Sequence, residues 1–167
     1  VIDTAFNRWT GFPADLHNDA GYLNPLFTRC FSTPAVADLD GDGDLEIVVG
    51  SFGLVADPAD WGGYIHAFHH TGAAVTGFPY ETRNAAWYSP GIADVDGLPG
   101  LEILTAACDS AMYIVTNTGD SLAGWPHRGF PTYFIPDQGN HGFIEGRIPM
   151  SKTPQLVDTD GDSLIEM

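Results

Sequence analysis

One short segment occurs three times along the chain, and this recurrence constrains the fold more than any other feature. In each copy, a short apolar run leads into an acidic loop that contains glycine. The loops begin at Asp38, Asp94 and Asp158, so that consecutive copies lie 56 and 64 residues apart. Repeats of this length are typical of solenoids, propellers and arrays, in which one structural unit is used several times.

The first acidic loop reads Asp-Leu-Asp-Gly-Asp-Gly-Asp-Leu-Glu and runs from Asp38 to Glu46. Ca²⁺ prefers six to eight oxygen ligands and tolerates irregular geometry, and without a cation these carboxylates would repel one another. Gly41 and Gly43 allow the sharp turn that such a loop needs. The spacing therefore predicts a calcium site whose side-chain ligands are Asp38, Asp40, Asp42 and Glu46, with the backbone carbonyl of Asp44 as a further ligand.

Two other interpretations of this loop are weaker. An EF-hand or dockerin-type loop needs a bidentate acid at position 12 and helical flanks, but position 12 is Val49 and the flanks, 34–37 and 46–50, have strand-like sequences. Asp and Gly also favour simple turns. Turn preference alone does not explain carboxylates at alternating positions that recur at each repeat. We therefore expect each acidic loop to join two strands of a hairpin.

The sequence between the loops predicts four short strands per repeat. In the first repeat we expect strands at 34–38, 46–51 and 63–69, then a last strand that ends in Gly-Phe-Pro at Pro79. The second repeat follows the same plan and ends in Gly-Trp-Pro. Four antiparallel strands joined by hairpins form one propeller blade. The prediction is an all-β protein with the end of a blade at 1–13, whole blades at 31–79 and 87–126, and the start of a blade at 151–167.

A propeller needs about 4 to 8 blades to close its ring. The predicted units number fewer than three, so we expect this chain to be a fragment of a larger propeller.

The charge of the chain supports cation binding and argues against two classes of partner. The formal net charge is −16, from 22 acidic and 6 basic residues, and 12 of the acidic residues lie in the three loops. Such an acidic chain is not expected to bind nucleic acid or an anionic membrane surface. Since no apolar run approaches the ~20 residues of a membrane span, no membrane insertion is expected either.

The repeat resembles the FG-GAP family, the calcium-binding blades of integrin alpha-chain propellers and of many bacterial secreted proteins. The motifs that carry the resemblance are the loop with its flanking strands, the run Tyr-Ile-x-Ala-Phe at 64–68, and the Gly-Phe-Pro tail. It implies a secreted or cell-surface protein that acts as a scaffold and as a binding or adhesion module for an extracellular protein or glycan. In that family, calcium loops lie on one rim and ligands bind on the opposite rim.

The resemblance also assigns metal ligands in the other two loops. In the third loop Ser163 replaces a turn glycine, and the implied ligands are Asp158, Asp160, Asp162, Glu166 and the carbonyl of Leu164. The second loop has Leu98 at position 5, and its implied ligands are Asp94, Asp96 and Glu102. Because the second loop has one carboxylate fewer, we expect calcium to bind it more weakly than the other two.

The longest connections, 52–62 and 127–150, belong to the rim opposite the calcium loops and contain aromatic residues. Long loops on a rigid scaffold are common binding sites. We therefore expect Trp61, Tyr133 and Phe134 to line a recognition surface; the alternative is that they pack these loops onto neighbouring blades.

No catalytic set is apparent, so the fragment itself is not expected to be an enzyme. The histidines at 66, 69 and 70 lack the pattern of a zinc helix, and no serine has a nucleophile-elbow context. The alternatives that remain are a portion, catalytic or not, of a secreted polysaccharide-degrading enzyme, and a spacer beside a catalytic domain. Cys30 and Cys108 can form a disulfide or remain as two buried thiols.

Overall fold

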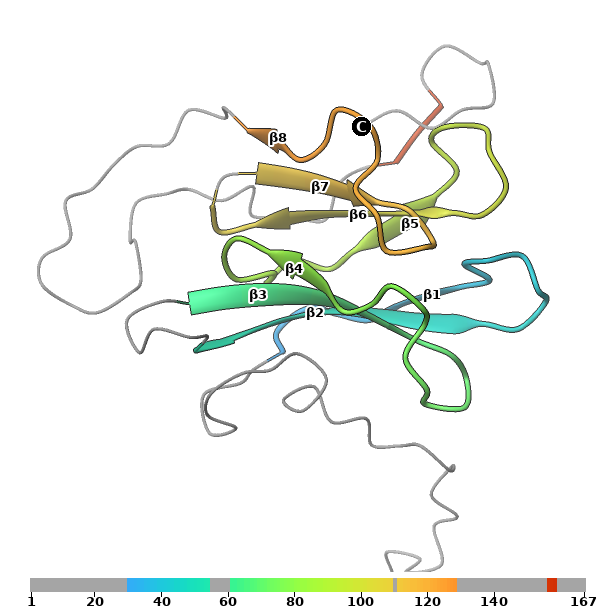
Figure 1. The fold of residues 1–167 in the computed structure, drawn as a ribbon, viewed down its shortest axis with the longest axis horizontal. Helices are drawn as coiled ribbons and strands as arrows, with labels where there is room; N and C mark the ends of the chain where they lie inside the picture. Colours follow the sequence, from blue (N-terminus) through green and yellow to red (C-terminus); the bar gives the residue numbers. More distant parts are fainter. Residues whose placement is uncertain (1–29, 55–60, 110, 129–155, 159–167) are drawn as a thin grey trace, which may run out of the picture.

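The computed structural model describes residues 30–54, 61–109, 111–128 and 156–158, and these residues form two four-stranded antiparallel sheets (Figure 1). The first sheet contains β1 (Ala35–Ala37), β2 (Glu46–Leu54), β3 (Trp61–Phe68) and β4 (Tyr80–Thr82). The second sheet contains β5 (Gly91–Ala93), β6 (Glu102–Ala107), β7 (Ala111–Val115) and β8 (His127–Arg128). The described part is therefore all-β, as the sequence predicts.

In each sheet the strands are neighbours in the order in which they occur along the chain. This is a meander, in which every connection is a hairpin. The first hairpin pairs Ala37 with Glu46, and its counterpart pairs Ala93 with Glu102. The two acidic loops thus connect the first two strands of their sheets, which confirms the predicted hairpin, and they lie at the same end of the molecule, on the right in Figure 1.

The position of the fourth strand in each repeat was predicted wrongly. We expected it to end at the Gly-Phe-Pro tail, but β4 and β8 begin directly after Pro79 and Pro126. The tail itself is a turn: Gly77 has a φ of 91°, and the amide of Phe78 donates to the carbonyl of Val75 over 3.1 Å. The fourth strand of each sheet therefore follows the tail instead of ending in it.

The tail is apolar because it packs into the core rather than because it is a strand. Val75 and Phe78 are buried in the same hydrophobic cluster as residues of β2 and β3. Gly77 has a separate steric reason, since a Cβ there would lie 1.9 Å from the carbonyl oxygen of Thr118, in the turn that follows β7 of the other sheet. An aromatic residue next to a required glycine is a turn signal that strand-pattern reasoning overlooks.

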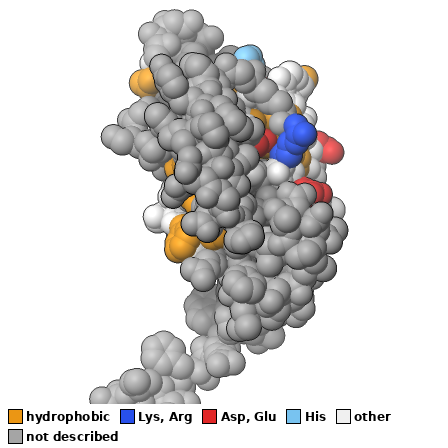
Figure 2. All heavy atoms as spheres, turned by 90° about the vertical axis from the view of Figure 1, so that its left-hand side faces the viewer, with side chains coloured by type: hydrophobic (Ala, Val, Ile, Leu, Met, Phe, Trp, Pro, Cys, Tyr) orange, Lys and Arg blue, Asp and Glu red, His pale blue; other side chains and the backbone are white. Residues whose placement is uncertain are grey.

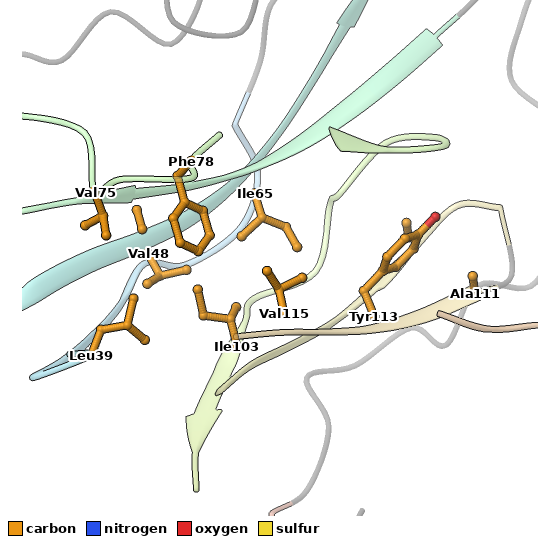
Figure 3. Close-up of a cluster of buried hydrophobic side chains, with 11 residues drawn as sticks. Leu39, Val48, Ile65, Val75, Phe78, Ile103, Ala111, Tyr113 and Val115 are labelled. Atoms are coloured by element: carbon orange, nitrogen blue, oxygen red, sulfur yellow. The ribbon is translucent and has the colours of Figure 1, made fainter. Parts of the chain in front are cut away.

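The two sheets pack face to face around one core (Figure 3). Val48, Ile65 and Ala67 come from the first sheet, and Ile103, Tyr113 and Val115 come from the second. The backbones also meet at the acidic loops, where the amide of Leu101 donates to the carbonyl of Leu39 over 2.9 Å. This contact fixes the two loops relative to one another.

The sheets meet through opposite faces of equivalent strands. Successive side chains on a strand point to opposite faces. Counted from the glutamates that end the loops, Val48 is equivalent to Leu104, whereas the contact residue Ile103 is equivalent to Ile47. The face of the second sheet that points away from the first sheet is also buried. Its residues Leu104, Met112 and Ile114 are equivalent to the contact residues Val48, Ile65 and Ala67 of the first sheet. The packing is therefore head-to-tail rather than two-fold symmetric.

Candidate metal centre

The first acidic loop brings three of its carboxylates together. One oxygen from each of Asp38, Asp40 and Asp42 lies within 4.8 Å of the others. The amides of Gly41 and Gly43 donate to the two carboxylate oxygens of Asp38 over 2.8 and 3.1 Å. Both glycines have positive φ values, 81° and 95°, which side chains rarely adopt. The loop backbone thus holds the Asp38 carboxylate in place.

Glu46, the last predicted ligand of this loop, lies apart from the three-carboxylate group. It is completely buried, and its Oε2 accepts a hydrogen bond from the amide of Leu39 over 2.9 Å. Its Oε1 lies 3.1 Å from Nδ1 of His69, just beyond the end of β3. The side chain of Asp44 lies 3.5 Å from Nδ1 of His70. Two histidines of the β3–β4 connection therefore contact the acidic end of the first hairpin.

The second loop uses its glutamate differently. Asp94, Asp96 and Glu102 each place an oxygen within 4.8 Å of the others. Oε2 of Glu102 accepts from the amide of Val95 over 2.9 Å, which matches the Glu46–Leu39 bond of the first loop. Burial raises the pKa of Glu102 above its usual value; the hydrogen bond from Val95 opposes this rise, and the charges of Asp96 and Asp94 add to it.

The loop expected to bind calcium most weakly therefore assembles as many clustered carboxylates as the first loop. Weaker calcium binding was expected because Leu98 replaces an aspartate at position 5 of the loop. This leucine is exposed. What the sequence did not indicate is that the first loop's glutamate contacts a histidine, whereas the second loop's glutamate faces the aspartates.

The remaining predicted site residues are only partly within the described ranges. Asp158 is described and half-buried, whereas Asp160, Asp162, Leu164 and Glu166 lie outside the described residues. Tyr133 and Phe134 also lie outside them. Trp61 begins β3, where it pairs with Leu54 at the end of the sheet opposite the acidic loops. The third metal site and the aromatic recognition surface stay predictions.

The donor chemistry of both clusters fits calcium. Each cluster offers carboxylate oxygens alone, without sulfur or imidazole, and hard oxygen ligands are those that Ca²⁺ prefers. Three carboxylates within 4.8 Å repel one another, and a divalent cation removes that repulsion. The arrangement can therefore hold a hard cation at the tip of each first hairpin.

Elsewhere in the described ranges, the strongest candidate for catalytic chemistry is a pair that substrate cannot reach. Oγ of Ser51 lies 2.7 Å from Nε2 of His66, and both residues are buried. Burial lowers the pKa of His66 to about 4, so this histidine is neutral near pH 7. The pair has the character of a buried polar contact between β2 and β3.

The cysteines are two free thiols. Cys30 is exposed, so the expectation of two buried thiols is wrong for this residue. Cys108 is half-buried, and burial together with the charge of Asp109 raises its pKa to about 11. A thiol with a raised pKa is a poor nucleophile.

Comparison with known proteins adds no assignment. No protein-family model matches the chain, and no curated protein and no solved structure matches it either. Within the described ranges, no helix is long and apolar enough to cross a membrane.

Proposed function

We propose that this chain is part of a calcium-stabilised β-propeller, with the acidic hairpin loops as structural calcium sites. The observation that carries this proposal is the pair of three-carboxylate clusters, which occupy equivalent hairpins of two equivalent sheets. Such a coincidence is expected if one metal-binding unit is repeated.

The packing of the two sheets supports the propeller part of the proposal. An interface between opposite faces leaves each unit able to receive another unit in the same way, so the contact can continue around a ring. A sandwich of two sheets related by two-fold symmetry would use equivalent faces. Burial of Leu104, Met112 and Ile114 on the far face of the second sheet agrees with a continuing stack.

Calcium in these loops has a structural role in the proposal. It neutralises clustered carboxylates and fixes the first hairpin of each blade. Because the unfolded chain has no preformed site, the free energy of calcium binding adds to the stability of the fold. Extracellular modules commonly bind calcium with dissociation constants of ~10⁻⁴ to 10⁻³ M, so millimolar extracellular calcium suffices.

The proposal extends to location and partner. We place the parent protein outside the cell or on its surface, as a scaffold and adhesion module that binds an extracellular protein or glycan. The rim opposite the acidic loops is the proposed binding rim, because the metal loops occupy the other end of the sheets. No catalytic role is assigned to the fragment.

Thermal unfolding with and without calcium tests the structural role. The chain should melt at a higher temperature as calcium is added from 0.1 to about 10 mM, which spans the affinities of extracellular modules. Asp40→Ala and Asp96→Ala should each reduce the shift, and the double variant should retain only the part that the predicted third loop contributes. Asp120→Ala is the matched control, because Asp120 is an exposed aspartate in the turn that follows β7, outside both acidic loops. An equal shift in the wild type and the double variant, or no shift in the wild type, would refute the calcium role.

A further inference from the structure

A turn of the second sheet lacks the contact that its counterpart makes in the first sheet. This turn, residues 122–125, precedes β8 and is called the tail surface below. Its counterpart is the turn 75–78, and the two have the same backbone. Gly77 and Gly124 have φ values of 91° and 90°, and the amide after each glycine donates to the carbonyl three residues earlier, over 3.1 and 2.9 Å. The two turns therefore offer the same backbone shape to a partner.

In the first sheet, the turn is covered by a turn of the second sheet. A Cβ at Gly77 would overlap the carbonyl oxygen of Thr118, and a Cβ at Gly119 would overlap the carbonyl oxygen of Gly77. The contact is reciprocal, so each of the two turns needs a glycine for the backbones to meet. The apolar side chains beside Gly77 are buried as a result: Val75 is 5% exposed and Phe78 is 8% exposed.

The tail surface shows no such cover among the described residues. Gly124 is exposed, and no described atom lies within 4 Å of a Cβ placed on it. Leu122 and Trp125, the equivalents of the two buried apolar residues in the first sheet, are only half-buried. A partly exposed tryptophan beside an open glycine is the kind of anchor that interfaces commonly bury. The tail surface is therefore one half of a contact whose complete form is present in the same molecule.

A residue of the third repeat indicates which element supplies the other half. A Cβ at Gly91 of β5 would lie 2.9 Å from Cδ1 of Leu156, so the two residues are close neighbours. Leu156 precedes Asp158 as Ile92 precedes Asp94, and Ile92 packs against the core between the sheets. The third repeat thus meets the second sheet at its first strand, just as β5 contacts β1.

The end of the sheets opposite the acidic loops gives no comparable guide to a partner. There, hydrophobic, basic and acidic side chains of the described residues lie close to one another (Figure 2). A mixed surface of this kind fits many partners. The tail surface differs, because the contact that covers its counterpart shows what chemistry the partner needs.

We propose that the tail surface is the docking site for a glycine turn of the repeat unit that follows in the chain. The partner is a tight turn at the end of a β-strand. It has a glycine at the position of Gly119, because the carbonyl of Gly124 occupies the space that a side chain would need. The inference rests on the proposed function as part of a propeller and adds the element by which one unit recognises the next. It does not require calcium, because the tail surface lies outside both acidic loops.

The sequence of the parent polypeptide after Met167 gives the first test. The equivalent turn glycines, Gly72 and Gly119, follow the first aspartate of their acidic loops by 34 and 25 residues. The same spacings after Asp158 place the expected glycine about 16 to 25 residues beyond Met167. An interval without a glycine would overturn the proposal.

Thermal unfolding in EDTA then compares this chain with a longer segment of the parent that includes the expected turn. Asparagine tolerates positive φ values, so Gly124→Asn fills the open space with little backbone strain. It should lower the melting temperature by less than about 2 °C in this chain and by more than about 5 °C in the longer segment. Gly77→Asn is the matched control and should be strongly destabilising in both, because Thr118 already occupies the space beside Gly77.

Two results of these measurements would also overturn the docking site. One is an equal loss for Gly124→Asn in the two chains. The other is a dimer of this chain in sedimentation that Gly124→Asn dissociates, which would assign the surface to a second copy. Since the comparison is made without calcium, it is independent of the metal proposal. Calcium stabilisation together with an equal loss would refute the docking site alone, and the reverse would refute the calcium role alone.

Discussion

The two acidic loops share the same backbone hydrogen bond, but their glutamates, Glu46 and Glu102, have different neighbours. In both, a buried glutamate accepts a hydrogen bond from the residue after the first aspartate. In the first loop the other oxygen of this glutamate contacts His69, whereas in the second loop the glutamate lies in the aspartate group. The residue equivalent to His69 in the second sheet is Thr116, which bonds within its own turn. A residue of the β3–β4 connection thus contacts one of the carboxylates that the sequence assigns to the cation.

The largest expected effect is a difference in calcium-free stability between two variants, one lacking Glu46 and the other lacking Glu102. Glu46→Ala should destabilise the fold by about 2–4 kcal/mol, because it leaves the buried amide of Leu39 unpaired and removes the partner of His69. Glu102→Ala also loses an amide partner, but it relieves repulsion with Asp94 and Asp96. Chemical denaturation in EDTA should therefore show the larger loss for Glu46→Ala. Equal losses would mean that the histidine contact adds nothing.

A smaller effect is expected when the histidine contact is removed. His69→Ala frees one oxygen of Glu46. Calcium should then bind the first loop about three- to tenfold more tightly, because a net hydrogen bond of ~1 kcal/mol no longer competes with the cation for this oxygen. The measurement is calcium titration in a background that carries Asp96→Ala and Asp160→Ala, which leaves the first acidic loop as the one unaltered loop. Thr116→Ala at the equivalent position is the matched control, in a background that carries Asp40→Ala and Asp160→Ala, and it should leave the affinity of the second loop unchanged. Weaker calcium binding in His69→Ala would contradict the comparison.

The smallest expected effect is a pH dependence that belongs to the second loop. A carboxyl whose folded-state pKa is raised binds protons more readily in the folded state. Without calcium, its contribution to stability is therefore present below its unfolded-state pKa and decreases as the pH rises through its folded-state pKa. Glu102→Gln should remove this decrease. The measurement is the difference between wild-type and variant melting temperatures from pH 4 to 7 in EDTA, and a constant difference would argue against it.

His66 must be separated from this measurement, because it acts in the opposite direction. Its pKa is lowered to about 4 by burial, so the stability that it contributes is present above pH 6.5 and is lost as the pH falls toward 4. The wild type and Glu102→Gln share His66, and taking their difference cancels its contribution as long as the two sites act independently.

Much of the local structure could be predicted from the sequence, because it depends on contacts between residues close along the chain. The acidic loops, their glycines and the hairpins that they join follow from alternating carboxylates between β-branched runs. The fourth strands were misplaced for a physical reason: the burial of Phe78 and the close approach of Gly77 to Thr118 are contacts across the sheets, which a strand pattern does not reveal.

Four features follow from periodicity and side-chain charge, which are local properties: the all-β class of the described residues, the repeat, the acidic hairpins and the oxygen-only chemistry of the hairpin tips. Packing between distant segments sets which faces of the sheets meet and which glutamate lies among its aspartates. Each of these depends on residues distant in the sequence that packing brings together, and side-chain direction across an interface is set by that packing.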